Sequence, residues 1–358
     1  MRFPFITEYR DDLRLLRYRS DWWSYGALLA VLLVLPAVLG RFYLGEVAFI
    51  FVLAIAAVGL MTLTGFTGLV SLGHGAFLGV GAYAHALLMA NGVPFVVALP
   101  AAGVATAAIG VAVGFPTLRL SGLYLAIATL AFSVIVEHVL GHWRSLTGGF
   151  LGLTVQRPDL FGWSLAGRTE FYYLCLAVLA GVVLAARNLL RSETGRAFIA
   201  LRDSETAAAA FGVNVAWYKT LAFAVSAGVT GIAGGLYAHK LGHITPEAFG
   251  LFTSLELVLM VVVGGLGSLR GAVLGAIFVG ALPQVIAFFR DVLPKGFLPT
   301  TGLELTLYGG ILVLFLLFEP DGLNGRWLKI KALFQTFPLY RRRTFQRTKT
   351  YMRSERYR

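Results

Sequence analysis

Residues 47–63 read VAFIFVLAIAAVGLMTL, an apolar run without a charged side chain. A membrane-spanning α-helix needs about 20 predominantly apolar residues. Similar runs recur along the 358 residues of the chain, which is 58% hydrophobic and only 13% charged. A soluble domain has about 25% charged residues, so lipid must be the solvent for much of this surface. The sequence therefore predicts an all-α integral membrane protein.

Apolar runs between charged or turn-rich breaks predict about ten transmembrane helices, some of them short or interrupted by glycine. Between residues 64 and 75 the sequence is the least helical, because glycine recurs there at short intervals. Irregular backbone at membrane depth survives only where protein or a water-filled cavity satisfies its polar groups. The predicted spans lie near residues 24–40, 44–63, 75–90, 94–114, 120–141, 170–190, 217–238, 252–265, 271–290 and 303–318.

Lysine and arginine are unevenly divided between the two faces that ten crossings create. If both termini are cytoplasmic, the inner segments hold 23 of these residues and the outer segments hold 7. Cytoplasmic loops carry such an excess, so we predict that both termini are cytoplasmic. The chain then divides into a cytoplasmic N-terminal segment (1–23), a transmembrane domain (24–318) and a basic cytoplasmic tail (319–358).

The net charge of +12 is concentrated beside the last span, where eleven lysines and arginines follow Phe318. Basic residues in this position fix the orientation of a membrane protein and contact anionic lipid. We therefore expect membrane lipid as a partner and no nucleic acid. The single cysteine, Cys175, excludes an intrachain disulfide.

The sequence patterns of common catalytic and metal sites are missing. There is no GxSxG elbow, and neither Lys-Thr dipeptide follows the glycine of a Walker A loop. The pairs His138/His142 and His239/His243 have the i,i+4 spacing of two metal ligands, but a zinc site needs further ligands. We expect no catalytic residue, no metal and no cofactor, so any ATP-driven work must come from another polypeptide.

Carboxylates at membrane depth are the next candidates. Glu137 and Glu256 lie within or near predicted spans, and Glu46 and Glu304 are expected at the outer boundary. An ionisable side chain in the membrane is costly and is a functional suspect by default. Pairing with a neighbouring helix, or anchoring at the interface, explains each of them equally well. No two of them share a proton-relay spacing, which argues against an ion-coupled mechanism.

The loop at residues 191–216 contains a predicted short helix. Asp203 or Ser204 is a good N-cap, Glu205 complements the positive start of the helix, and Gly212 is a natural residue just past its end. Such a helix is compact enough for a groove on another protein, although an ordinary loop helix has the same composition.

A weak internal repeat relates two glycine-interrupted segments. Residues 68–79 resemble residues 265–275 when one position is skipped. Paired segments of this kind point to a translocation path in transporters. The alternative is chance, because Gly, Ala and Leu recur in any membrane protein.

Six motifs in order resemble the permease subunits of ABC importers for branched-chain amino acids, of the LivM-like type. The resemblance extends from about residue 45 to residue 323. A single motif of this kind has little specificity, but six in the expected order are specific. The motifs occupy residues 65–83, 120–132, 146–153, 195–212, 237–249 and 263–269.

The resemblance implies a non-catalytic subunit of an ATP-driven importer in the bacterial inner membrane. It also implies three kinds of partner: a second homologous permease subunit, two cytoplasmic ATP-binding subunits and a periplasmic substrate-binding protein. Residues 24–318 would be the permease domain, with a cytoplasmic coupling loop at 191–216. The implied ATPase-coupling residues are Arg202, Asp203, Glu205, Ala207, Ala208 and Gly212.

The implied substrates are branched-chain or related hydrophobic amino acids. Polar candidates for the pathway, near the glycine breaks, are Ser71, His74, Thr129 and Glu137. Each could equally form an ordinary hydrogen bond between helices. Relatives with the same motifs carry urea or short amides, which is the first alternative. A self-sufficient secondary transporter or channel, and a membrane enzyme with a histidine-bound metal, are alternatives of other classes.

Overall fold

The computed structural model describes residues 19–156, 159–160, 163–164, 167–292, 303–318 and 322–336. Helices dominate these residues, which confirms the predicted all-α fold. In chain order the helices are α2 (Arg19–Val38), α3 (Arg41–Leu60), the π-helical turn η1 (Met61–Gly65), α4 (His74–Ala90), α5 (Phe95–Gly114), η2 (Pro116–Arg119), α6 (Gly122–His142), α7 (Arg144–Thr147), η3 (Gly149–Leu151), α8 (Arg168–Arg191), α9 (Glu193–Asp203), α10 (Glu205–Ala210), α11 (Val215–Leu241), η4 (Pro246–Phe249), α12 (Leu251–Gly264), α13 (Leu269–Val292), α14 (Leu303–Phe318) and α15 (Gly322–Thr336).

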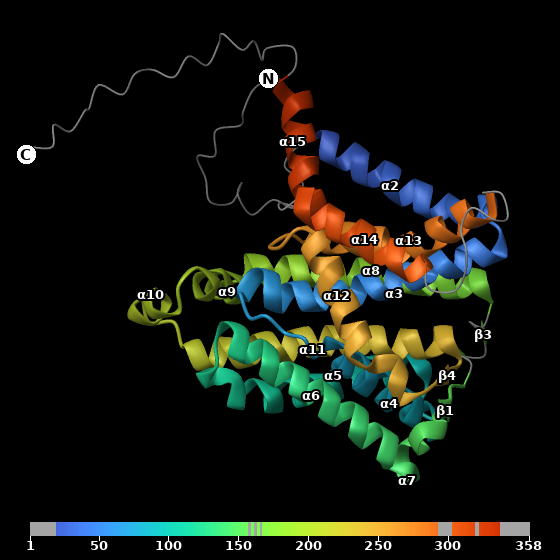
Figure 1. Cartoon of the computed structure of the whole chain (residues 1–358), viewed down its shortest axis with the longest axis horizontal. Helices are drawn as coiled ribbons and strands as arrows, with labels where there is room; N and C mark the ends of the chain where they lie inside the picture. Colours follow the sequence, from blue (N-terminus) through green and yellow to red (C-terminus); the bar gives the residue numbers. More distant parts are fainter. Residues whose placement is uncertain are drawn as a thin grey trace, which may run out of the picture.

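The few strands form two short antiparallel pairs. β1 (Leu153–Thr154) pairs with β4 (His243–Ile244), and β2 (Asp159–Leu160) pairs with β3 (Trp163–Ser164). Figure 1 shows a helical bundle with α9 and α10 at one end and with β1, β4 and α7 at the opposite end. The long helix α11 runs between these two ends, so it connects both sides of the bundle.

Each of the ten predicted spans falls on a helix, but the helices differ in length. In the described part of the chain, seven helices are long and apolar enough to cross a membrane. The other three predicted spans fall on shorter helices: Tyr25–Val38 within α2, His74–Ala90, and the 16-residue α14. The seven are Arg41–Gly65, Phe95–Gly114, Gly122–His142, Arg168–Arg191, Val215–Leu241, Pro246–Gly264 and Leu269–Phe288.

The helix α3 forms the centre of the bundle. Every residue from 50 to 63 is buried, as expected for a helix that is apolar on all sides. It packs against α8, α11 and α13, and α11 in turn packs against α4 and α5. The first predicted span, α2, is peripheral by contrast, with a largely exposed apolar surface.

Two tyrosine hydroxyls hold α2 against α8. Proline lacks the N–H that would bond four residues back along a helix, so Pro36 leaves the carbonyl of Leu32 without its helical donor. The Tyr172 hydroxyl donates to this oxygen at 2.8 Å, and the Tyr173 hydroxyl donates to the Leu33 oxygen at 2.9 Å. The hydrogen bond that Pro36 cannot donate within α2 is therefore replaced by one from Tyr172 of α8.

The predicted terminal segments are described only in part. Residues 1–18 and 337–358 lie outside the described part of the chain. The first turn of α15 is packed against the bundle, because Leu323 contacts the main hydrophobic core and a Cβ on Gly322 would lie 2.6 Å from the backbone of Gly265. Residues 326–330 are exposed, as expected for a basic tail.

Glycines set the distance between α4 and α11. A Cβ atom on Gly81 would collide with the backbone of Gly231, and one on Gly234 would collide with the carbonyl of Leu78. Helices in lipid gain much of their association energy from such close backbone packing. The high glycine content of the sequence thus has a direct structural use here.

We expect Gly81→Ala to destabilise the protein, because overpacking of this kind costs about 1–3 kcal/mol. The matched control is Gly181→Ala on α8, where the added methyl has no atom within 4 Å. Replacing a mid-helix glycine by alanine without a clash stabilises a helix by roughly 0.5–1 kcal/mol. The midpoint of unfolding in mixed detergent should therefore fall for the first variant and stay or rise for the second. Equal midpoints would contradict close packing at Gly81.

Candidate functional site

The predicted short helix of the loop is α10, and its two ends are capped as the sequence suggested. The Ser204 hydroxyl accepts a hydrogen bond from the Ala207 N–H at 3.3 Å. Gly212 has a φ of +83°, and the next N–H, of Val213, bonds back to the Ala208 oxygen at 3.0 Å. Helices commonly end with a residue of positive φ, after which the next N–H donates to a carbonyl in the last turn. Glycine is favoured at the position of positive φ.

The helix α9, which precedes α10, attaches this region to the membrane domain. Its Phe198 is fully buried in a hydrophobic cluster. The cluster includes Leu63, which lies just before the first glycine break (residues 66–73), together with Phe77 of α4 and Phe223 of α11. A phenylalanine buried among several helices couples their positions, because protein interiors are close-packed. Phe198 was not singled out from the sequence, since a lone aromatic residue in a polar loop shows no pattern.

Arg202, at the end of α9, lies against both glycine segments of the internal repeat. A Cβ on Gly68 would lie 3.2 Å from Cγ of Arg202, and one on Gly267 would lie 3.3 Å from its Nη1. Gly65, three residues before the first segment, also lies against the second segment, because a Cβ on Gly65 would lie 2.8 Å from the Gly267 nitrogen. The segments that the sequence related by similarity are therefore neighbours, with Arg202 beside them.

The other predicted coupling residues are distributed between surface and interior. Asp203, Ala207 and Gly212 are exposed, Glu205 is half-exposed and Ala208 is buried. Asp203 accepts hydrogen bonds from Nε and Nη2 of the neighbouring Arg202. The most exposed large hydrophobic side chain here is Phe211, at 88% exposure, which no sequence pattern indicated.

The first glycine break, residues 66–73, is held by buried polar side chains. His74, which is fully buried, lies 2.9 Å from Ser71 through Nδ1 and 2.7 Å from Ser226 through Nε2. The Ser226 hydroxyl donates to the Gly59 oxygen at 2.6 Å. The bond to Gly59 uses the only hydrogen of the Ser226 hydroxyl, so Nε2 of a neutral His74 must donate to Ser226. Nδ1 of His74 then carries no hydrogen and must accept from the Ser71 hydroxyl.

Two further helices bind the end of the break and the start of α4. The Thr129 hydroxyl of α6 accepts from the Leu72 N–H at 3.0 Å, and the Ser254 hydroxyl of α12 accepts from the Gly75 N–H at 2.9 Å. The structure thus brings together three of the four predicted pathway residues: Ser71, His74 and Thr129.

Glu137, the fourth predicted pathway residue, lies apart from this network. It sits two turns beyond Thr129 on α6, where a Cβ on Gly250 would lie 2.9 Å from its Oε2. Ser133 falls between them at the same i,i+4 spacing, so the three side chains share one helix face. Ser133 is buried, and its hydroxyl has no hydrogen-bond partner among the described residues.

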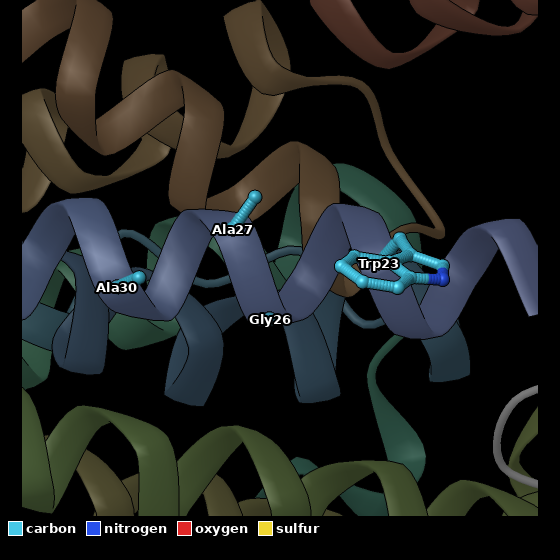
Figure 2. Close-up of a pocket in the computed structure, with 4 residues that line it drawn as sticks. All are labelled: Trp23, Gly26, Ala27 and Ala30. Atoms are coloured by element: carbon cyan, nitrogen blue, oxygen red, sulfur yellow. The ribbon is translucent and has the colours of Figure 1, made fainter.

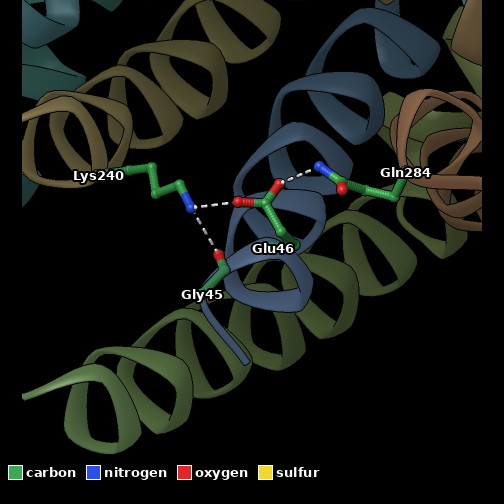
Figure 3. A network of polar contacts seen from close by, with 4 residues as sticks. All are labelled: Gly45, Glu46, Lys240 and Gln284. Carbon is green, nitrogen blue, oxygen red and sulfur yellow. Dashed lines mark hydrogen bonds and ion pairs between the residues drawn. The ribbon is translucent and has the colours of Figure 1, made fainter. Parts of the chain in front are cut away.

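Both carboxylate oxygens of Glu46, a residue predicted at the outer boundary, have partners. Its two oxygens bind Lys240 at 3.0 Å and Gln284 at 3.1 Å, and Lys240 also donates to the Gly45 carbonyl at 2.9 Å (Figure 3). The network joins α3, α11 and α13, so a role in anchoring these helices is sufficient to explain Glu46. Glu256 lies half-buried in α12, and the side chain of Glu304 is outside the described residues.

The histidines of the two i,i+4 pairs lie close to other groups of the protein. His239 lies 2.8 Å from His85, whereas His243 lies against the Leu151 oxygen. The rings of His138 and His142 are stacked at 3.9 Å. In the part of the chain that the structure describes, no group of three or more His, Cys, Asp or Glu side chains is placed to hold a metal ion.

A groove lies against the peripheral helix α2. It has a volume of about 430 Å³ and is lined by Trp23, Gly26, Ala27 and Ala30 (Figure 2). This lining offers a single polar group, the indole N–H of Trp23. An amino acid carries both a carboxylate and an ammonium group, so the groove does not match such a substrate.

Comparison with known proteins gives consistent matches. The model of the family "branched-chain amino acid transport system / permease component" matches residues 43–316. The high-affinity branched-chain amino acid transport system permease protein LivM of Escherichia coli (strain K12) is 33% identical over 322 residues, covering 83% of this chain and 73% of that protein. LivH of the same strain is 26% identical over 296 residues, covering 76% and 91%. The autoinducer 2 import system permease protein LsrC of Escherichia coli O157:H7 is 29% identical over 283 residues, covering 74% and 79%.

The matched region contains every predicted coupling and pathway residue, six of the seven long apolar helices, and all but the first two residues of the seventh, Arg41–Gly65. These helices and the relatives identify a multi-pass membrane protein. The extent of the match and the identity to LivM agree with the motifs found in the sequence. The chain belongs to the branched-chain amino acid transport system permease family.

Proposed function

We propose that this chain forms half of the translocation pathway of an ATP-driven importer for branched-chain or related hydrophobic amino acids in the bacterial inner membrane. The observation that carries the proposal is the contact of the α9–α10 region, at one end of the bundle, with both glycine segments through Arg202. A second homologous permease subunit would complete the pathway. Two cytoplasmic subunits would hydrolyse ATP, and a periplasmic protein would deliver the substrate.

The orientation follows from the charge distribution. Ten crossings with both termini in the cytoplasm put α9 and α10 inside and β1, β4 and α7 outside, which agrees with their positions at opposite ends of the bundle. Phe211 then points into the cytoplasm, where a partner protein could cover it. Exposed aromatic residues with this degree of exposure are frequent anchors of protein interfaces.

Transmission into the membrane would use the buried part of the same region. An ATPase that binds one of two states more tightly shifts the equilibrium between them. Movement of α10 would displace Phe198 and Arg202, and these contact the residues around the two glycine segments. Residues 68–73 and 265–268 of these segments lie outside regular helices, so they are the places where the backbone can rearrange at least cost.

The substrate must find polar partners inside the pathway. Ser133 on α6 has hydrogen-bonding capacity left, and it lies with Glu137 on the same face as Thr129. The similarity to LsrC, whose name specifies autoinducer 2 import, shows that relatives of this chain serve different solutes. Urea or a short amide, which relatives with the same sequence motifs carry, is the competing substrate.

Cysteine labelling tests the orientation. Cys175 is the single cysteine and is buried, so the unmodified protein should not react. In spheroplasts, a membrane-impermeant maleimide should label Leu151→Cys, at a position that is 84% exposed. It should label Phe211→Cys only after the membrane is opened. Labelling of Phe211→Cys from the outside would contradict the cytoplasmic position of α10.

Phe211→Ala tests ATPase docking. The side chain makes little contact within the chain, so folding should be unaffected, whereas loss of an interface anchor lowers affinity by roughly tenfold or more. Co-purification of the ATP-binding subunits should fall accordingly. The matched control is Phe252→Ala, because Phe252 is 87% exposed and lies on α12. Equal ATPase recovery in both variants would contradict the docking assignment.

Calorimetry on the cognate periplasmic binding protein tests the substrate class. That protein selects the solute before the permease meets it, so it should bind leucine, isoleucine or valine at least about tenfold more tightly than urea. Preference for urea or an amide would overturn the amino-acid assignment and leave the permease assignment standing.

A further inference from the structure

Lys219 is an unusual residue for its position. It lies in the second turn of α11, and its side chain is only 4% exposed. Among the described residues it is the only lysine, arginine, aspartate or glutamate that is buried. A buried charge is costly unless it is paired and hydrogen-bonded. Its Nζ lies 2.7 Å from Oε2 of Glu205, which supplies that partner.

The partner belongs to the first turn of α10. Glu205 is 41% exposed at the side chain, so one carboxylate faces solvent and the buried lysine together. A protein that docks on α10 changes the solvation and charge around Glu205, and through it the environment of Lys219. The pair is therefore positioned to respond to docking.

Lys219 also lies on the helix that holds the first glycine break. Ser226 follows it by seven residues, which is about two turns, so both side chains leave α11 on the same face. The Ser226 hydroxyl binds His74 and the Gly59 oxygen. One rigid helix thus connects the ion pair to the buried polar network.

Stability alone does not account for such a pair. Apolar residues of similar volume often replace a buried ion pair without loss of stability, whereas removing one partner strands a charge. The better-attested use of a buried pair is to select one arrangement of helices over another.

We propose that Lys219 is a positioning residue of the transport cycle: its ion pair with Glu205 fixes α10 to α11, so that displacement of α10 by an ATPase is passed along α11 to Ser226 and His74. This inference rests on the proposed function. Phe198 and Arg202 attach α9, whereas the ion pair attaches α10 itself.

The test uses the complete importer, with both permeases, both ATPases and the binding protein, reconstituted in vesicles. The measured quantity is substrate taken up per ATP hydrolysed. Lys219→Met should lower this ratio roughly tenfold while the ATPases still assemble and hydrolyse ATP. Exchanging the charges, with Glu205→Lys and Lys219→Glu together, should restore the ratio to within about threefold of the original protein.

The control is Lys240→Met, which breaks the ion pair at the other end of α11, where Lys240 is 25% exposed. It should leave the ratio unchanged. A Lys219→Met ratio within about twofold of the original would overturn the inference. If the importer with Lys219→Met fails to assemble, the variant with exchanged charges decides. If that variant assembles but takes up as little substrate per ATP as Glu205→Lys alone, the inference is also overturned. Absence of ATP-driven uptake by the unmodified complex would instead refute the proposed function.

Discussion

The arrangement of the bundle depends on one constraint: backbone that leaves the helical pattern inside a membrane must find its hydrogen bonds within the protein. The first glycine break meets this constraint with side chains from three other helices. Thr129 of α6 binds the break, Ser226 of α11 binds the histidine that follows it, and Ser254 of α12 binds the N–H of Gly75, the next residue. These helices cannot separate from the break without exposing unpaired polar groups, each of which costs about 1–3 kcal/mol when buried.

The same constraint applies where the region at α9 and α10 contacts the bundle. Regular helices are stiff, and their internal bonds do not depend on their neighbours. A break whose bonds are supplied by neighbours changes when those neighbours move. Arg202 lies beside both glycine segments, and Phe198 enters the hydrophobic cluster next to the first. The loop thus contacts the bundle where the backbone depends most on other helices for its hydrogen bonds.

Sequence reasoning succeeded where structure is decided locally. Apolar length predicted the positions of the helices, and the Ser204 and Gly212 signals predicted both ends of α10. It missed contacts between residues far apart in the chain, because no periodicity encodes them: His74 and Ser226 are 152 positions apart. The i,i+4 histidines show the same limit of local patterns, since His239 has as its neighbour His85, which comes from another helix and lies 154 positions away.

The polar residues near the break differ in what they can offer a substrate. His74 uses both ring nitrogens and is fully buried, and Ser71 and Thr129 each already bind the break. A carboxylate or ammonium group that reached any of them would have to replace a bond that holds the break, so binding there could not leave the backbone unchanged. Ser133 could accept a new hydrogen bond at no such cost. A substrate that first meets Ser133 and then competes for Thr129 would bind the two backbone states with different affinity, which is the requirement for coupling its passage to a conformational change.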